Sequence, residues 1–312
     1  MIDIYPLKFV PVYKDKVWGG NALKTMFGRK LPTERIGEAW ELASHARGMS
    51  IVRNGVLAGR TLQELVGLYK KRLLGEMAIN EQMFPFLIKI IDATDNLSIQ
   101  VHPDDGFAAR MEVGNGKSEA WYVLDAQENA KIIYGLKPGI NKAEFIRSVK
   151  DNVLDSLCSV PVQSGDMIYV PAGTVHAIGG GMVVYEIQQN SDITYRLYDY
   201  ERSDEKLRPL QVDNAIACLN FNQKLDYNFK QASLKTPFFA IERLMVNGKS
   251  EFNICDQFVV MYVIAGEGEI AWRGGEESIA KGDTILIPAC LGEFTVVGSI
   301  TWLKVVSSVN KS

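Results

Sequence analysis

The chain has 312 residues, of which 47% are hydrophobic and 23% charged, so its composition is that of an ordinary globular protein with room for two domains. A net charge of −3 supplies no basic field for nucleic acid, and no apolar run is long enough for a membrane span. The four cysteines lie far apart without a CxxC pair, which predicts reduced thiols and a cytoplasmic protein. They are Cys158, Cys218, Cys255 and Cys290.

The first part of the chain shows extended patterns followed by a helical one. Residues 5–20 contain proline and glycine turns, and the alternation over 37–45 predicts a strand that ends at His45. Thr61 and Glu64 have the spacing of a capping box, and the apolar residues after Thr61 follow helical spacing. We therefore expect a helix over 62–74.

A polar strand face follows the apolar run 86–91. In a strand, Ser98, Gln100 and His102 share one face, and Ile99 with Val101 forms the other. Taken alone, this pattern is typical of a half-buried strand with one side in water. The motifs found further along the chain favour a functional role for the polar face.

The remaining pattern consists of short β-rich runs bounded by glycine or proline, with helical stretches between them. It predicts a mainly β protein, a sandwich or barrel with α-helical insertions. The predicted insertions are about 61–80, 104–114, 141–158 and 204–220. Polar and turn residues around 224–237 predict a boundary between domains 1–230 and 231–312.

An eight-residue segment occurs twice. The pattern Gly-Asp, four β-forming residues and Pro-Ala at 165–172 recurs at 282–289, which indicates a duplicated fold. His176 follows the first copy, whereas Glu293 stands at the matching place after the second, and no histidine lies beyond 176. We therefore expect the C-terminal domain to be a degenerate copy that holds no metal.

The spacing of Gly165, Pro171, Gly173 and His176 resembles the second motif of the cupin superfamily. In that superfamily the first motif supplies a histidine and then a glutamate, and the resemblance gives these roles to His102 and Glu119. Two imidazoles and a carboxylate suit zinc or another divalent first-row ion and leave a position open for substrate. Gln100 is a candidate fourth ligand, and we expect one zinc ion per chain.

Several stretches resemble the type I mannose-6-phosphate isomerase family in its short bacterial form, strongly from about residue 10 to 220. These stretches are 18–20, 37–45, 86–92, 98–105, 117–122, 171–177 and 185–199. The resemblance implies a duplicated cupin β-barrel or jelly roll, called a bicupin, and an aldose-ketose isomerase acting on a sugar phosphate. Longer relatives carry a histidine before the lysine of the Lys117 motif, where this chain has Gly116. A mechanism that uses that histidine for proton transfer cannot apply here.

The resemblance also implies roles for further residues. Arg196 matches the catalytic arginine of the family, and as a permanent cation it suits the stabilisation of an enediolate. Ser98 and Lys117 match positions associated with substrate or phosphate binding. Trp18 is expected to line the substrate pocket together with His45 and Trp121, although each of these three could equally be an ordinary core residue.

The proton-transferring base has two candidates. Glu186 alternates with Val184 and Gln188 on one strand face, where burial would raise its pKa. Its alternative role is a structural ion pair with Arg196. Asp192 is the rival base, and its alternative role is to cap a turn.

Three functions compete at this stage. The first is a zinc-dependent isomerase that interconverts mannose 6-phosphate and fructose 6-phosphate by enediol proton transfer. The second is a cupin oxygenase using Fe(II), which offers no task for Arg196 or Lys117, and the third is a non-catalytic sugar-phosphate-binding protein. We expect no nucleic-acid or membrane partner, and either a monomer or a homodimer.

Overall fold

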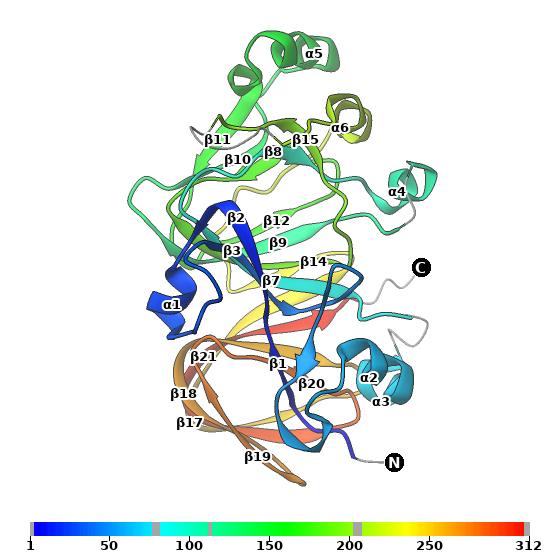
Figure 1. Ribbon diagram of the computed structural model, residues 1–312, viewed down its shortest axis with the longest axis vertical. Coiled ribbons are helices and arrows are strands. Elements are labelled where there is room, and N and C mark those ends of the chain that lie inside the picture. Colours follow the sequence, from blue (N-terminus) through cyan, green and yellow to red (C-terminus); the bar gives the residue numbers. More distant parts are fainter. Residues whose placement is uncertain (1–2, 77–81, 112–113, 202–207, 309–312) are drawn as a thin grey trace. The chain divides into compact units, whose positions relative to one another are not determined.

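The computed structural model describes residues 3–76, 82–111, 114–201 and 208–308 (Figure 1). The chain forms two compact units. One unit comprises Tyr13–Ala39 and Lys89–Lys230, and the other comprises the segment up to Val12, Trp40–Ile88 and the chain from Gln231 onward. The chain passes from one unit to the other at Lys230 and Gln231, and residues 40–88, which lie within the predicted domain 1–230, group with the chain from Gln231 onward.

The unit formed by 13–39 and 89–230 is built on a five-stranded and a six-stranded antiparallel sheet. The five-stranded sheet has the order β11 (Leu157–Pro161), β10 (Lys131–Leu136), β13 (His176–Ile178), β8 (Ile99–Val101) and β15 (Tyr195–Tyr198). The six-stranded sheet has the order β12 (Met167–Val170), β9 (Glu119–Ala126), β14 (Met182–Gln189), β7 (Phe86–Ala93), β3 (Ile36–Leu42) and β2 (Val12–Gly20). Apolar residues of both sheets, including Ile132 and Trp121, form one core cluster, so the sheets face one another.

Helices cover the outer face of the five-stranded sheet (Figure 1). Phe145 of α5 (Lys142–Asp151) and Ala215 of α6 (Val212–Cys218) pack with Ile99 and Val101, which point away from the polar face of β8. The other helical segments of this unit are α1 (Ala22–Phe27), α4 (Asp105–Met111) and the short η3 (Val153–Ser156). The polar face of β8 therefore points into the space between the two sheets.

The other unit is centred on an eight-stranded sheet. Its strands are β16 (Ser233–Lys235), β17 (Phe239–Asn253), β21 (Glu293–Ser307), β18 (Val259–Trp272), β20 (Thr284–Ile287), β1 (Leu7–Val10) and β6 (Ile51–Val52), with β19 (Gly275–Ala280) paired to β18. The hairpin β4 (Ser44–His45) and β5 (Gly48–Met49), η1 (Gly55–Leu57), α2 (Leu62–Tyr69) and α3 (Lys71–Leu74) complete it. The mainly β fold expected from the sequence is confirmed.

The capping box predicted at Thr61 is confirmed, and a second one begins α5. Thr61 Oγ1 accepts a hydrogen bond from the Glu64 N–H (3.2 Å) and Glu64 Oε2 accepts one from the Thr61 N–H (2.8 Å), and Asn141 caps α5 in the same manner. The expected single helix over 62–74 is divided, because Lys70 adopts φ 40° and ends α2 before α3 begins. In the described part of the last predicted insertion, 208–220, the helix begins at Val212. Residues 77–80, 112–113 and 204–207 of the predicted insertions lie outside the described residues.

The internal repeat has matching local structure in its two copies. Gly165 and Gly282 both have left-handed backbones, with φ of 91° and 90°. The carboxylates of Asp166 and Asp283 accept hydrogen bonds from the N–H groups three residues earlier, at 2.9 and 3.0 Å. The strands that follow are β12 and β20, so both copies form the same turn and strand.

The four cysteines are free, as expected. Among the helices that the structure describes, none has the length and apolar character needed to cross a membrane.

Candidate active site

A row of side chains crosses three neighbouring strands of the five-stranded sheet. Gln100 on β8 stands opposite His176 on β13 and opposite Arg196 on β15. Directly opposed residues of antiparallel strands point their side chains to the same face. Strand pairing therefore brings together residues that are far apart in sequence.

Glu119 of the facing sheet completes a buried cluster with His102 and His176. The possible ligand atoms of these three residues all lie within 4.8 Å of one another. Nε2 of His102 is 3.3 Å from Glu119 Oε2, and Nε2 of His176 is 3.4 Å from Glu119 Oε1. The Nε2 atom of His176 is also 3.5 Å from the Gln100 side-chain amide.

The hydrogen bonds of both imidazoles fix their tautomers. Nδ1 of His102 lies 2.9 Å from the Ile193 carbonyl oxygen, and Nδ1 of His176 lies 2.9 Å from the Thr174 carbonyl oxygen. A carbonyl oxygen only accepts, so each Nδ1 donates its proton. Burial lowers the pKa of both rings, that of His102 to about 3. Both Nε2 atoms are thus unprotonated, and each lies within 3.4 Å of a Glu119 carboxylate oxygen.

Lys117 is the cation of this cluster. Its Nζ lies 2.7 Å from His102 Nε2 and 2.6 Å from Glu119 Oε2. Burial, the largest single effect, would raise the pKa of the Glu119 carboxyl, but Lys117, His102 and His176 together outweigh it and hold that pKa well below its ordinary value. Glu119 is therefore an anion, and its Oε1 accepts a hydrogen bond from the Trp121 indole (3.0 Å).

This donor set fits a divalent metal ion. It offers two neutral imidazole nitrogens and one carboxylate, and both histidines are oriented by carbonyl groups, the outer-shell arrangement common to metal-binding histidines. The Lys117 ammonium contacts two of these donor atoms, His102 Nε2 and Glu119 Oε2, so the donors suit a positively charged group. The side chains that would hold the ion are His102, Glu119 and His176, with Gln100 beside them.

Glu186 lies in a second buried polar group of the same unit. Its Oε2 accepts a hydrogen bond from Lys89 Nζ at 2.7 Å, and the same ammonium donates to Gln188 Oε1 at 2.5 Å. Burial raises the pKa of Glu186, and the nearby Lys89 charge only partly offsets this effect. The ion pair considered between Glu186 and Arg196 is instead formed with Lys89, which the sequence analysis did not single out.

Arg196 lines a cleft of about 600 Å³. The same cleft is lined by Lys16, Arg35 and Arg208, and by the carboxylates of Asp15 and Glu34. Burial lowers the pKa of the Arg196 guanidinium, and its buried Nε has no hydrogen-bond partner among the described residues.

The other predicted site residues have different surroundings. Trp121 contacts Glu119, whereas Trp18 is buried in the core cluster, where its indole N–H finds no partner within the described part of the chain. His45 belongs to the hairpin β4–β5 of the other unit and packs edge-on against Trp40. Ser98 is buried just before β8, and Asp192 is half-buried between β14 and β15.

One site residue was missed although the sequence carried a signal for it. Lys89 interrupts the continuous apolar run 86–91, and all eight residues of β7 are buried. A lysine in such a run must place its ammonium against a buried acceptor. That pattern could have identified Lys89 as part of a polar site.

The fold and the site define the class of protein. The chain has a cupin-type β fold with a buried His/Glu/His site able to hold a metal ion. Residues 6–131 match the family model "Phosphomannose isomerase type I, catalytic domain", and residues 230–307 match "Mannose-6-phosphate isomerase, cupin domain". The chain belongs to the type I phosphomannose isomerase family, whose members are enzymes.

Relatives along nearly the whole chain support this assignment. Mannose-6-phosphate isomerase ManA of Bacillus subtilis is 38% identical over 94% of this chain and 96% of its own length. The mannose-6-phosphate isomerase of Streptococcus mutans is 36% identical over 91% of this chain and 93% of its own. A crystal structure of the mannose 6-phosphate isomerase from Bacillus subtilis superposes with a TM-score of 0.89 at 34% identity and covers 97% of this chain and 99% of that one.

Proposed function

We propose that this chain interconverts mannose 6-phosphate and fructose 6-phosphate and uses one zinc ion, held by His102, Glu119 and His176 with Gln100 as a fourth ligand. The observation that carries the proposal is the convergence of two neutral imidazoles and a carboxylate within 4.8 Å in a member of this family. When bound, a divalent ion at this place polarises sugar oxygens without redox change.

The reaction moves one proton from C2 of the aldose to C1 of the ketose, and a second from the hydroxyl at O2 to O1. Glu186 is the proposed base for the carbon-bound proton, since a raised pKa suits a group that both accepts and returns a proton. Lys89 holds this carboxylate in place. Asp192 is retained as the alternative base.

Arg196 is the proposed electrostatic catalyst. Its permanent charge stabilises the enediolate as negative charge develops on O1 and O2. Its Nε, which has no hydrogen-bond partner in the described ranges of the chain, is a donor that a substrate oxygen would satisfy. The place of Arg196 beside Gln100 in the strand register supports this role.

The phosphate requires cations. Lys117 and Ser98 are the proposed contacts, and Lys117 has to release His102 and Glu119 before it can bind a phosphate oxygen. Trp18 and Asp192 complete the proposed substrate pocket. The cations of the Arg196 cleft are further candidates, because the phosphate carries up to two negative charges.

The test is formation of fructose 6-phosphate from mannose 6-phosphate, measured before chelation, after chelation and after zinc is restored. We expect activity that is lost with the metal and regained with zinc. Undiminished activity in metal-free enzyme would contradict the zinc role, and oxygen consumption without isomerisation would contradict the reaction. We further propose a cytoplasmic enzyme, active as a monomer or homodimer.

A further inference from the structure

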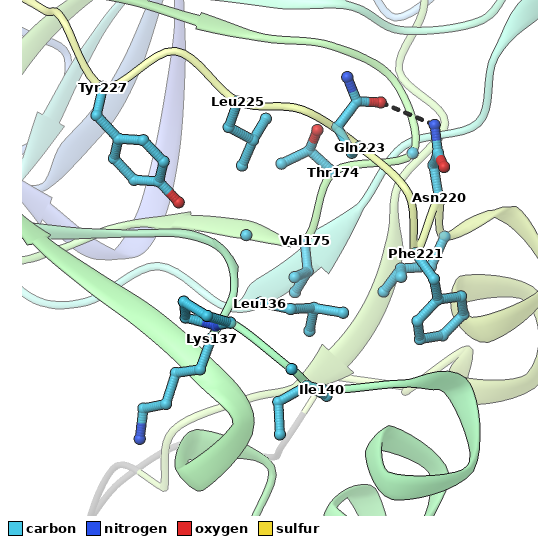
Figure 2. Close-up of a pocket in the computed structure, with 15 residues that line it drawn as sticks. Leu136, Lys137, Ile140, Thr174, Val175, Asn220, Phe221, Gln223, Leu225 and Tyr227 are labelled. Carbon is cyan, nitrogen blue, oxygen red and sulfur yellow. Dashed lines mark hydrogen bonds between the residues drawn. The ribbon is translucent and has the colours of Figure 1, made fainter.

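A pocket of about 240 Å³ borders residues 173–175, beside the five-stranded sheet (Figure 2). Val175 lines it and packs with the core beneath α5 and α6, while the next residue, His176, points to the cluster. The walls come from residues 135–140, 173–175 and 219–227. We call this space the rear pocket.

The rear pocket has uncharged hydrogen-bonding groups beside apolar ones. Asn220 Nδ2 donates to Gln223 Oε1 at 3.0 Å on one side, and the rings of Phe221 and Tyr227 contribute apolar surface (Figure 2). Among the described residues that line it, only Lys137 is charged, and its ammonium donates to the Asp155 carbonyl oxygen at 2.8 Å. Amide groups with aromatic and aliphatic surface suit a small uncharged ligand that carries several hydroxyls.

Thr174 also favours a ligand that carries hydroxyl groups. Thr174 is one of the residues that line the rear pocket and is 3% exposed, and its buried hydroxyl has no hydrogen-bond partner among the described residues. A χ1 rotation of the threonine would bring this hydroxyl into the pocket, where a ligand hydroxyl can satisfy it.

The loop that carries Thr174 also holds both histidines of the cluster. The Gly173 N–H donates to the His102 carbonyl oxygen at 2.8 Å, and the Thr174 carbonyl oxygen accepts from His176 Nδ1 at 2.9 Å. A molecule that contacts residues 173–175 therefore contacts a loop that is hydrogen-bonded to the backbone of His102 and to the imidazole of His176.

We propose that the rear pocket binds an uncharged polyol of hexose size, and that its occupancy is coupled to the metal-capable cluster through residues 173–175. This proposal concerns binding and needs no isomerase activity. Outer-shell partners of metal-binding histidines change metal affinity when they are disturbed, so the coupling has a measurable consequence.

The binding experiment uses D-mannose as the probe and the full chain loaded with zinc, followed by calorimetry. We expect saturable binding that is weakened at least about tenfold in the double variant N220A/Q223A and in T174V, and retained in T174S. N222A is the matched control, since Asn222 lies on the same loop and does not line the pocket. Equal mannose affinity in N220A/Q223A and N222A would place the sugar elsewhere and overturn the proposal, as would the absence of mannose binding to the wild-type chain.

The coupling experiment measures zinc affinity by competition with a chromogenic chelator, with and without saturating mannose. We expect a change of about threefold or more in the wild-type chain and none in N220A/Q223A. An unchanged zinc affinity in the presence of bound mannose would overturn the coupling. Neither measurement requires turnover, so failure of the isomerase assay is distinguished from failure of this proposal.

Discussion

Lys89 and Glu186 form an ion pair across 97 residues of sequence, with 2.7 Å between Nζ and Oε2. The two side chains are only 10% and 4% exposed. Burial by itself would lower the pKa of Lys89, but the carboxylates of Glu186, Glu38 and Glu119 together outweigh it and the net shift is upward. Glu186 has the largest effect of the three, and it accepts a hydrogen bond from the lysine.

Removing this lysine is expected to destabilise the fold. K89M leaves a buried carboxylate unpaired, and the free energy of unfolding should fall by about 3–5 kcal/mol. The matched control is K249M, which removes an ammonium from an exposed pair with Glu251 and should cost less than about 1 kcal/mol. Chemical denaturation measures both, and equal stability of K89M and K249M would contradict a structural role for the buried pair.

Arg196 is expected to increase kcat. R196A should lower kcat by about two to three orders of magnitude, because it removes charge stabilisation of the enediolate. R196K should restore little, since an ammonium does not reproduce the donors of a guanidinium. R110A removes an exposed arginine on α4 and serves as the control. Steady-state kinetics with equal kcat for R196A and R110A would rule out the assigned role.

Gln100 is expected to contribute to metal binding less than the charged or imidazole ligands. Q100A should weaken zinc binding by about 10–100-fold, the usual cost of disturbing a supporting group at a metal site. H176A should remove measurable binding. Q127A removes an exposed glutamine outside the cluster as a control. Competition with a chelator gives the affinities, and a Q100A value equal to that of Q127A would exclude Gln100 as a ligand.

The metal-free protein is expected to lose stability in acid. Burial, with the Lys117 charge, lowers the pKa of His102 from 6.5 to about 3. Unfolding therefore takes up a proton between these values, so this contribution to stability is complete above pH 6.5 and is lost as the pH falls. One proton corresponds to a slope of about 1.4 kcal/mol per pH unit. Denaturation of chelated protein between pH 7 and 4 should give a shallower slope for H102N, and an identical slope would contradict the assignment of a buried neutral His102.

Local signals predicted much of the fold. The capping boxes at Thr61 and Asn141 depend on residues three apart, and the alternation that separates Gln100 from Ile99 and Val101 depends only on strand geometry. The division into units depends on contacts distant in sequence. Residues 40–88 group with the C-terminal segment through interactions such as the hydrogen bond from Thr284 to Glu41 (3.2 Å), and no local pattern encodes these partners.

The candidate site shows the same contrast. Motif spacing brought His102, Glu119 and His176 together as a hypothesis, and strand register places them within reach of one ion. The partner of Glu186 was not predicted, because β7 and β14 meet through sheet order and either Lys89 or Arg196 could supply the charge. Whether Glu186 or Asp192 transfers the proton stays a prediction.

The most direct test of the metal assignment is a crystal structure of the zinc-loaded protein, with anomalous scattering recorded on both sides of the zinc edge. We expect one strong peak per chain, about 2 Å from Nε2 of His102, Nε2 of His176 and a carboxylate oxygen of Glu119. A fully loaded crystal with its zinc peak elsewhere and no density among these three side chains would contradict it.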